Sequence, residues 1–549
     1  MALGLALALW GSGGLRAQSA AEVSALVAAL PEAQRSLSRS ALAHGASAAL
    51  VRAYATGGNA PLWMSAGTAS ASAQALIGEL RGAERYGLRA QDYAGEALAQ
   101  ELKALPASAA GRTAALARFD THLSAAALRL ICDLHFGRVS PEAAGFQLEQ
   151  TPGPFDLAQA LRSLAQSGDP EGALTAVEPV FYHYKLLKDA LAHYRKLAPE
   201  LGALPALPPV RTSVKSGEAY AGAAVLRRRL EILGDLPGGA AVPADPARYD
   251  AELSAAVGRF QDRHGLDADG VLGRATLAAL NTPVAQRIRQ ISLTLERWRW
   301  LVPFKTPPII VNIPQFQLFA FRSTEDRMAD ILQMHVIVGR TFARTQTPVF
   351  EGDMRYVVLR PYWDVPYSIT QKEMLPKIRS SPGYLAREHL QLVDGPGDNS
   401  PVVPPSAANL ALLAQGRLRL RQEPGEDNAL GLAKFMLPNS YNVYLHSTPA
   451  HQLFRDSVRA FSHGCIRVAD PLALATLVLA DAPGEWTREK IQAAMNGSST
   501  VRVNLSRPIN VLILYGTALA TEGGPVLFFP DLYGYDRKLE QQLHLPPAR

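Results

Sequence analysis

The chain has 549 residues, enough for about two to four domains of ordinary size. Hydrophobic residues make up 48% and charged residues 19%, which excludes a largely disordered protein. The net charge of +6 is too small to indicate nucleic-acid binding, although it suits an anionic polymer or a carboxylate-bearing substrate. With two cysteines, Cys132 and Cys465, the chain has neither a disulfide framework nor a metal site built mainly from thiolates.

The start of the chain resembles an export signal. Residues 3–10 are apolar, and small residues follow up to Ala17 and Ala20, which predicts a signal peptide over 1–20. No basic residue precedes Arg16, so an apolar helix at the start of a cytosolic protein is the alternative. No 18-residue apolar run occurs elsewhere, and no internal transmembrane helix is expected.

Residues 21–210 are rich in alanine and leucine at helical spacing. Leu123, Ala127 and Leu130 repeat at intervals of three and four residues, which predicts the buried face of a helix. Cys132 lies in the same segment and is expected to be a small core residue. Because no cluster of catalytic residue types occurs here, the region is predicted to be a helical scaffold domain.

A proline-rich linker at 205–213 leads into a second block over 212–283. Three short apolar-periodic segments, followed by the turn signal Asp269-Gly270, predict a small three-helix bundle. The pattern, including Phe260-Gln261, closely resembles the peptidoglycan-binding repeat of cell-wall enzymes. A helical spacer that binds no ligand is the alternative interpretation.

Residues 305–515 change to strand patterns. Alternating and β-branched segments such as 309–321 and 508–515 predict a mainly-β, sandwich-like or barrel domain. An insertion over 366–434 has helical character and is expected to be a lid or binding loop. Residues 516–549 are expected to pack on the scaffold or on this domain. The predicted fold class is therefore multidomain α+β.

The residue types that carry chemistry are concentrated in 444–471. Cys465 lies beside a histidine and a glycine, outside any apolar helix, which is unusual for an inert cysteine. A cysteine nucleophile needs a base for its thiol proton and main-chain N–H donors for the oxyanion that forms on attack. The amides of Gly464 and Cys465 are candidates for those donors. Either His463 or His446 could be the base, and spacing alone does not choose between them.

The pattern H-x15-S-H-G-C, from His446 to Cys465, resembles the signature of the L,D-transpeptidase catalytic domain. The resemblance implies that Cys465 is the nucleophile and that His446 is the proton donor and acceptor, its imidazole held by the backbone carbonyl of Ser447. It further implies that Ser462, His463 and Gly464 support the motif and that Arg467 occupies its last position.

The resemblance extends over about 60–549 and is closest to the large, multidomain periplasmic branch of the family. Two departures are Ser447, where an acidic residue is commoner, and Arg360, where asparagine often begins the segment. The family implies a thioester acyl-enzyme that forms 3→3 cross-links between peptidoglycan tetrapeptide stems. It implies no cofactor or metal, a periplasmic location associated with the wall or the inner membrane, and other cell-wall synthesis enzymes as potential partners.

Three alternatives compete with this interpretation. A zinc site could use His446, His451, His463 and Cys465, although no H-E-x-x-H motif or nearby acidic ligand supports it. The chain could be a non-catalytic wall-binding protein, or a thiol hydrolase acting as an L,D-carboxypeptidase or endopeptidase. Arg467 is expected either to bind a substrate carboxylate or to form a salt bridge with Asp470.

Overall fold

The computed structural model describes residues 20–65, 67–106, 111–148, 153–238, 245–325, 331–381 and 383–546. The chain divides into two compact units, Met1–Arg138 with Pro152–Pro179, and Val139–Thr151 with Val180–Arg549. The signal peptide expected over 1–20 lies, except for Ala20, outside the described residues. Within the described part of the chain, no helix is both long and apolar enough to cross a membrane.

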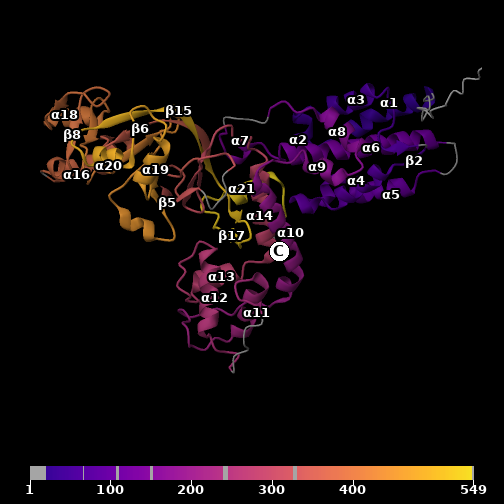
Figure 1. Cartoon of the computed structure of the whole chain (residues 1–549), viewed down its shortest axis with the longest axis horizontal. Helices are drawn as coiled ribbons and strands as arrows, with labels where there is room; N and C mark the ends of the chain where they lie inside the picture. Colours follow the sequence, from indigo (N-terminus) through magenta and orange to yellow (C-terminus); the bar gives the residue numbers. More distant parts are fainter. Residues whose placement is uncertain are drawn as a thin grey trace, which may run out of the picture. The chain divides into compact units, whose positions relative to one another are not determined.

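The first unit is helical, as predicted (Figure 1). The 24-residue helix α6 (Arg112–His135) packs against α1, α3 and α8, and its leucines and alanines form one buried core with them. Cys132 lies in that core with no exposed surface, which confirms the prediction from its apolar neighbours. The other elements of this unit are α1 (Ala20–Arg35), α2 (Arg39–Ala43), α3 (Ala46–Thr56), β1 (Met64–Ser65), β2 (Thr68–Ala69), α4 (Ala71–Arg81), α5 (Gly95–Lys103), α8 (Leu157–Gln166) and α9 (Pro170–Thr175).

The second unit contains the predicted three-helix bundle. Its helices are α11 (Ala223–Leu233), α12 (Ala251–Asp262) and α13 (Arg274–Leu280), and they enclose a core of their own. The buried Gln261 side chain donates to Asp269 Oδ1 and to the Thr276 hydroxyl, which fixes the turn before α13. These contacts explain why a polar glutamine occupies the buried face of α12.

Two longer helices of the second unit flank this bundle in the sequence. Helix α10 (Tyr182–Ala203) packs along α14 (Val284–Trp298), and they share an apolar cluster with β16 (Ala518–Ala520) and β17 (Val526–Phe528). Arg263 of the bundle forms a buried ion pair with Asp235 at 2.5 Å, and its carbonyl accepts from the Phe528 N–H. The bundle therefore has buried polar contacts with the last strands of the chain.

The mainly-β domain is built on a nine-stranded sheet, which confirms the β-rich prediction and defines it as a barrel. In the described residues the strand order is β13-β5-β14-β12-β11-β6-β15-β3-β4, and an additional pairing of β4 with β5 closes eight of these strands into a ring. Closure leaves those eight strands without an unpaired edge, and the apolar side chains inside the ring share one core with neighbouring helices. The strands are β3 (Ile309–Asn312), β4 (Gln317–Ala320), β5 (Leu332–Gly339), β6 (Phe350–Leu359), β11 (Ala433–Met436), β12 (Leu445–His446), β13 (Ala460–Ser462), β14 (Ile466–Val468) and β15 (Val501–Leu514).

The segment between β6 and β11 folds into a small subdomain with its own apolar cluster. A four-stranded sheet of order β7-β10-β8-β9 is accompanied by short helices, one of which, η3 (Thr370–Met374), is a π-helical turn. Short π-helical segments are frequent at functional sites. The other elements are β7 (Trp363–Asp364), α15 (Tyr367–Ile369), α16 (Leu375–Ser380), α17 (Tyr384–Arg387), β8 (Leu390–Val393), β9 (Val402–Val403), α18 (Ala407–Ala414) and β10 (Arg419–Gln422).

After β14 the chain forms α19 (Pro471–Val478) and α20 (Arg488–Asn496), and it ends with α21 (Tyr535–Gln542). The buried Asp536 carboxylate accepts from Arg297 of α14 and from the Thr517 hydroxyl, each at 2.6 Å. The Tyr533 hydroxyl donates to the Gly339 carbonyl at the end of β5. The C-terminal segment thus packs against both α14 and the barrel.

Candidate active site

Strand register places the motif residues on one face of the barrel wall. His446 on β12 lies opposite Lys434 of antiparallel β11 and opposite Arg467 of parallel β14. Residues that pair in this way point to the same face of a sheet. The alternate residues, such as Leu445 and Ile466, lie in the core. The row Lys434–His446–Arg467 therefore lies on the face away from the core.

His446 has a defined tautomer. Its Nδ1 lies 2.5 Å from the Ser447 carbonyl oxygen, so Nδ1–H donates and Nε2 carries the free lone pair. Only 5% of the residue is exposed. Burial and the positive charge of Arg467 lower the pKa of His446 to about 3, with Lys434 acting in the same direction. The imidazole is therefore neutral at physiological pH and can accept a proton.

Cys465 directly precedes β14 and continues its register. The Ile466 N–H donates to the Tyr444 carbonyl, which places Cys465 beside Tyr444 of the neighbouring chain segment. The thiol donates to the Asn442 carbonyl oxygen at 3.7 Å. Burial raises the pKa of the Cys465 thiol, while the Tyr444 main-chain N–H, Lys434 and Arg467 act in the opposite direction. A neutral thiol thus precedes the strand that pairs with β12, the strand of the neutral imidazole.

The turn before Cys465 is held by hydroxyl groups. The Ser462 hydroxyl donates to the Cys465 carbonyl at 2.5 Å and accepts from the Gly464 N–H at 3.1 Å. Thr347 Oγ1 donates to the Gly464 carbonyl at 2.8 Å and accepts from the Gly339 N–H. Gly464 has φ +123°, a conformation that residues with a side chain rarely adopt. These bonds fix the path of the motif around Gly464.

The two main-chain donors expected for an oxyanion hole have different partners in the structure. The Gly464 N–H was a candidate for half of an oxyanion hole, but it already donates to the Ser462 hydroxyl. The main-chain N–H of Cys465 makes no hydrogen bond with any residue that the structure describes. Of the two expected donors, the Cys465 N–H is therefore the available one, because the Gly464 N–H is bonded to the Ser462 hydroxyl.

The second candidate base, His463, contacts the inserted subdomain. Its Nε2 lies 2.8 Å from the Glu373 carboxylate of η3, and both side chains are partly exposed. Glu373 is 90 residues from His463 in the chain. This contact joins the Ser462–Cys465 turn to the insertion, whereas His446 is the histidine paired with the Cys465 strand.

Arg467 is not engaged in the salt bridge with Asp470 that was one of its two expected roles. The Asp470 carboxylate accepts from the Ala473 N–H and caps helix α19. Burial and the nearby Arg340 lower the pKa of Arg467, and Cys465 opposes them. Arg467 forms no ion pair with a described carboxylate, so its charge remains available at the site.

The residues proposed for a zinc site do not converge. His451 is exposed on η4 (His451–Arg455), and His463 is paired with Glu373. In the described ranges, no group of three or more histidine, cysteine or acidic side chains is placed to hold a metal ion.

Two polar neighbours of the Cys465 thiol, Tyr444 and Lys434, were not predicted as such from the sequence. Tyr444 lies against Cys465, and burial followed by the nearby thiol raises the pKa of its phenol. The Lys434 ammonium lies over the Tyr444 ring, 4.1 Å from its centre. The alternation of buried Ala433 and Phe435 around Lys434 is the sequence signal that would have placed the lysine on the outer face.

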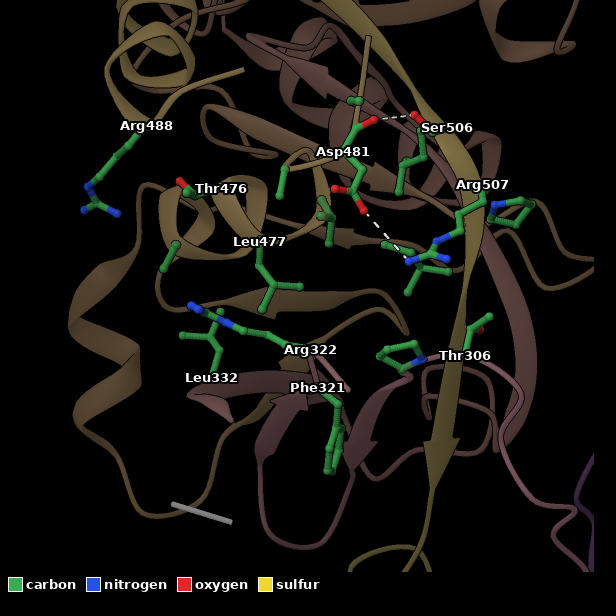
Figure 2. A pocket seen from close by; sticks show the side chains of 18 residues that line it. Thr306, Phe321, Arg322, Leu332, Thr476, Leu477, Asp481, Arg488, Ser506 and Arg507 are labelled. Atoms are coloured by element: carbon green, nitrogen blue, oxygen red, sulfur yellow. Dashed lines mark hydrogen bonds and ion pairs between the residues drawn. The ribbon is translucent and has the colours of Figure 1, made fainter. Parts of the chain in front are cut away.

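A cavity of about 510 Å³ lies elsewhere on this domain, between α19, β15 and the end of β4 (Figure 2). No histidine or cysteine lines it. Figure 2 shows Asp481 directed towards Arg507, with 3.8 Å between the charged atoms, and Arg488 on the opposite side of the cavity. It has no nucleophile–base pair, so the row on β11, β12 and β14 is the candidate active site.

The site thus holds a cysteine and a neutral, main-chain-anchored histidine on adjacent segments of the barrel wall, residue types that suit thiol-dependent acyl transfer. Comparison with known families agrees: residues 307–503 match the model described as "L,D-transpeptidase catalytic domain". Residues 221–280 match the model described as "Putative peptidoglycan binding domain", and 48–191 match that of a "Scaffold domain". The chain therefore contains an L,D-transpeptidase catalytic domain and a peptidoglycan-binding domain.

One curated relative shares this similarity. It is described as a "Putative L,D-transpeptidase" from Haemophilus influenzae and is 32% identical over 252 residues. The aligned region covers 46% of this chain and 49% of the relative, so the match spans about half the length of each.

Proposed function

We propose that the protein is an L,D-transpeptidase that joins peptidoglycan stems through 3→3 cross-links, with Cys465 as nucleophile and His446 as general base and acid. The observation that supports the proposal is the pairing of β12 with β14, the strand that Cys465 precedes, together with an imidazole that is neutral and anchored through Nδ1. A base must be unprotonated before the reaction, and burial among positive charges keeps His446 in that form.

Each proton and bond has a destination in the proposed reaction. The thiol proton of Cys465 passes to His446 Nε2 as Sγ attacks the carbonyl carbon of the third stem residue. The C–N bond to the terminal D-alanine breaks, His446 returns the proton to the departing amine, and a thioester remains. The side-chain amine of an acceptor stem then attacks the thioester, giving its proton to His446, and the C–S bond breaks to regenerate the thiol.

The oxyanion formed in both half-reactions needs a hydrogen-bond donor. The Cys465 N–H is the motif donor that remains free, and the Ser462–Gly464 bond holds the turn in place around it. We therefore assign the Cys465 N–H to the oxyanion, and Ser462, Thr347 and Gly464 to positioning.

Arg467 is proposed to bind a carboxylate of the donor peptide. Its guanidinium has no acidic partner among the described residues, and arginine suits bidentate binding of a carboxylate. The same contact would be available to the carboxylate of a β-lactam. We expect a carbapenem to form a stable adduct on Cys465, with a lower yield in Arg467→Ala.

The insertion between β6 and β11 is proposed to act as a lid over the acyl-enzyme. The contact between His463 and Glu373 joins it to the catalytic turn, and each half of that pair is exposed enough for the contact to break and re-form. The peptidoglycan-binding match over 221–280 supports the cell wall as substrate, and we propose that the protein acts on the wall in the periplasm.

The proposal is tested with purified disaccharide tetrapeptides and mass analysis of the products. We expect cross-linked dimers with loss of D-alanine from wild type and none from Cys465→Ala, with Cys132→Ala as the matched control. Tripeptides without dimers would identify a hydrolase instead. No conversion of the peptides by a folded, thiol-reactive wild-type protein would contradict the proposed function.

A further inference from the structure

Lys434 occupies an unusual position for a lysine. It lies on β11 in the middle of the barrel wall, directly opposite His446, and it is only partly exposed. Its ammonium lies 4.1 Å from the centre of the Tyr444 ring. Among the residues that the structure describes, Lys434 forms no ion pair and no side-chain hydrogen bond.

Such a placement costs free energy. Burial lowers the pKa of Lys434, because a charged ammonium loses hydration there. The Asp364 carboxylate acts in the opposite direction and raises the pKa of Lys434, but this carboxylate is paired with Arg419 at 2.6 Å. A cation–aromatic contact recovers part of the lost hydration. Because the free-energy cost of burying the ammonium is only partly offset, we expect the positive charge of Lys434 to stabilise another group at the site.

The group at the site that a positive charge would stabilise is the Cys465 sulfur in its ionised form. Tyr444 lies between the two residues. The Lys434 ammonium lies over the Tyr444 ring, and the main chain and phenol of Tyr444 lie against the thiol. A thiolate buried beside a neutral phenol and a neutral imidazole needs a positive charge nearby.

The other charged and titratable groups around the sulfur have separate positions. Arg467 lies on β14, on the other side of His446, and Arg340 follows β5 and donates to the Phe461 carbonyl. Asp364 and Asp398 belong to the insertion, where the Asp364 carboxylate is paired with Arg419 and the Asp398 main-chain carbonyl accepts from Arg421. Lys434 is therefore the positive charge on the Tyr444 side of the thiol.

We infer that Lys434 is an electrostatic positioning residue for the reaction, which stabilises the anionic sulfur of Cys465 across the Tyr444 ring. The inference rests on the proposed function, and it adds a residue on β11 to the Cys–His pair. The same charge opposes protonation of His446, so Lys434 favours the state in which the imidazole is neutral and the sulfur can ionise. Lys434 donates no proton and forms no bond in this role.

The test measures the ionisation of Cys465 without any wall substrate. The rate of Cys465 alkylation by iodoacetamide is followed from pH 5 to pH 10 by peptide mass mapping, which separates it from Cys132. In Lys434→Met we expect the midpoint of the profile to rise by about one pH unit, so alkylation at pH 7 slows about tenfold. Lys434→Arg, which keeps the charge, should lie within about threefold of wild type.

Lys490→Met is the matched control. Lys490 also lies over an aromatic ring, 4.9 Å from the centre of Trp486, but it belongs to α20 and does not contact the site. Its alkylation profile should equal that of wild type. Lys434→Gln replaces the methionine variant if the latter does not fold, as judged by circular dichroism and thermal melting.

An unchanged midpoint in a folded, charge-free Lys434 variant would overturn the inference and assign the lysine to packing on Tyr444. That outcome leaves the proposed function intact, because the function depends on product formation by Cys465 from tetrapeptides. Conversely, a protein that forms no product but shows the shifted midpoint would refute the proposed function and retain the role of Lys434.

Discussion

The two cysteines of this chain show how far surroundings decide what a thiol can do. Cys132 lies in the last turn of α6 with no exposed surface, among leucines and alanines, and burial with the neighbouring Asp133 raises the pKa of its thiol. Cys465 is also buried enough for the pKa of its thiol to rise, but a tyrosine N–H, Lys434 and Arg467 oppose the shift. The comparison shows that nearby positive charges oppose the effect of burial at Cys465, whereas at Cys132 burial and a negative charge act together.

The largest expected effect comes from exchanging each cysteine for alanine. Cys465→Ala should abolish turnover and the carbapenem adduct, because it removes the proposed nucleophile. Cys132→Ala should keep both activities and lower the free energy of unfolding by about 1–2 kcal/mol, through the small cavity left in the helical core. Intact-protein mass spectrometry after carbapenem treatment and chemical denaturation measure the two outcomes. A carbapenem adduct on Cys132 in the Cys465→Ala variant would contradict the proposed difference in reactivity between the two cysteines.

The next effect separates the two histidines near Cys465. His446→Ala should slow acylation by about 10²–10⁴-fold, the usual contribution of a general base. His463→Ala should slow it by less than about tenfold, because this side chain contacts Glu373 of the insertion. Stopped-flow acylation by a reporter β-lactam measures both rates. If the His463 variant were the slower of the two, the roles of the histidines would be exchanged.

The acid sensitivity of the fold should also reflect His446. The pKa of this histidine is lowered from 6.5 to about 3 in the folded protein, so its contribution to stability is complete above pH 6.5 and decreases as the pH falls towards 3. Between pH 7 and pH 4.5, wild type should lose about 3 kcal/mol of unfolding free energy that His446→Gln does not lose. Urea denaturation over this range gives the difference, and parallel curves for the two proteins would contradict it.

The smallest expected effect concerns the turn that presents Cys465. Ser462→Ala removes the hydroxyl that joins the Gly464 N–H to the Cys465 carbonyl, and it should lower the unfolding free energy by about 1–2 kcal/mol. Acylation should slow by about tenfold while Cys132 stays unreactive. Ser506→Ala, at a distant part of β15, is the control for loss of a serine hydroxyl. Equal acylation by both variants would show that the turn holds its geometry without the serine.

Much of the domain plan was accessible from sequence. Helical spacing around Leu123 and Ala127 predicted the buried face of α6, and the three short periodic segments predicted the bundle. These are local properties, because the period of apolar residues reports directly on helix or strand. The motif from His446 to Cys465 predicted which residue types meet, but the choice between two histidines came from resemblance alone.

The features that spacing could not supply depend on strand pairing between distant segments. The pairing of β4 with β5 closes the barrel, but the sequence pattern of neither strand predicts which strand it pairs with. The contact of His463 with Glu373 joins residues 90 positions apart, and the bond of the Gly464 N–H to the Ser462 hydroxyl depends on the turn conformation.

By itself the sequence determined the helical and β-rich regions, the buried character of Cys132 and the presence of a thiol–imidazole motif, since composition and periodicity record which side chains avoid water. The tertiary structure alone decided which charges surround the thiol. Lys434, His446 and Arg467 come from three strands, and only their register sets them in one row. A shift of one residue in either pairing would turn a cation into the core, because alternate residues of a strand point to opposite faces.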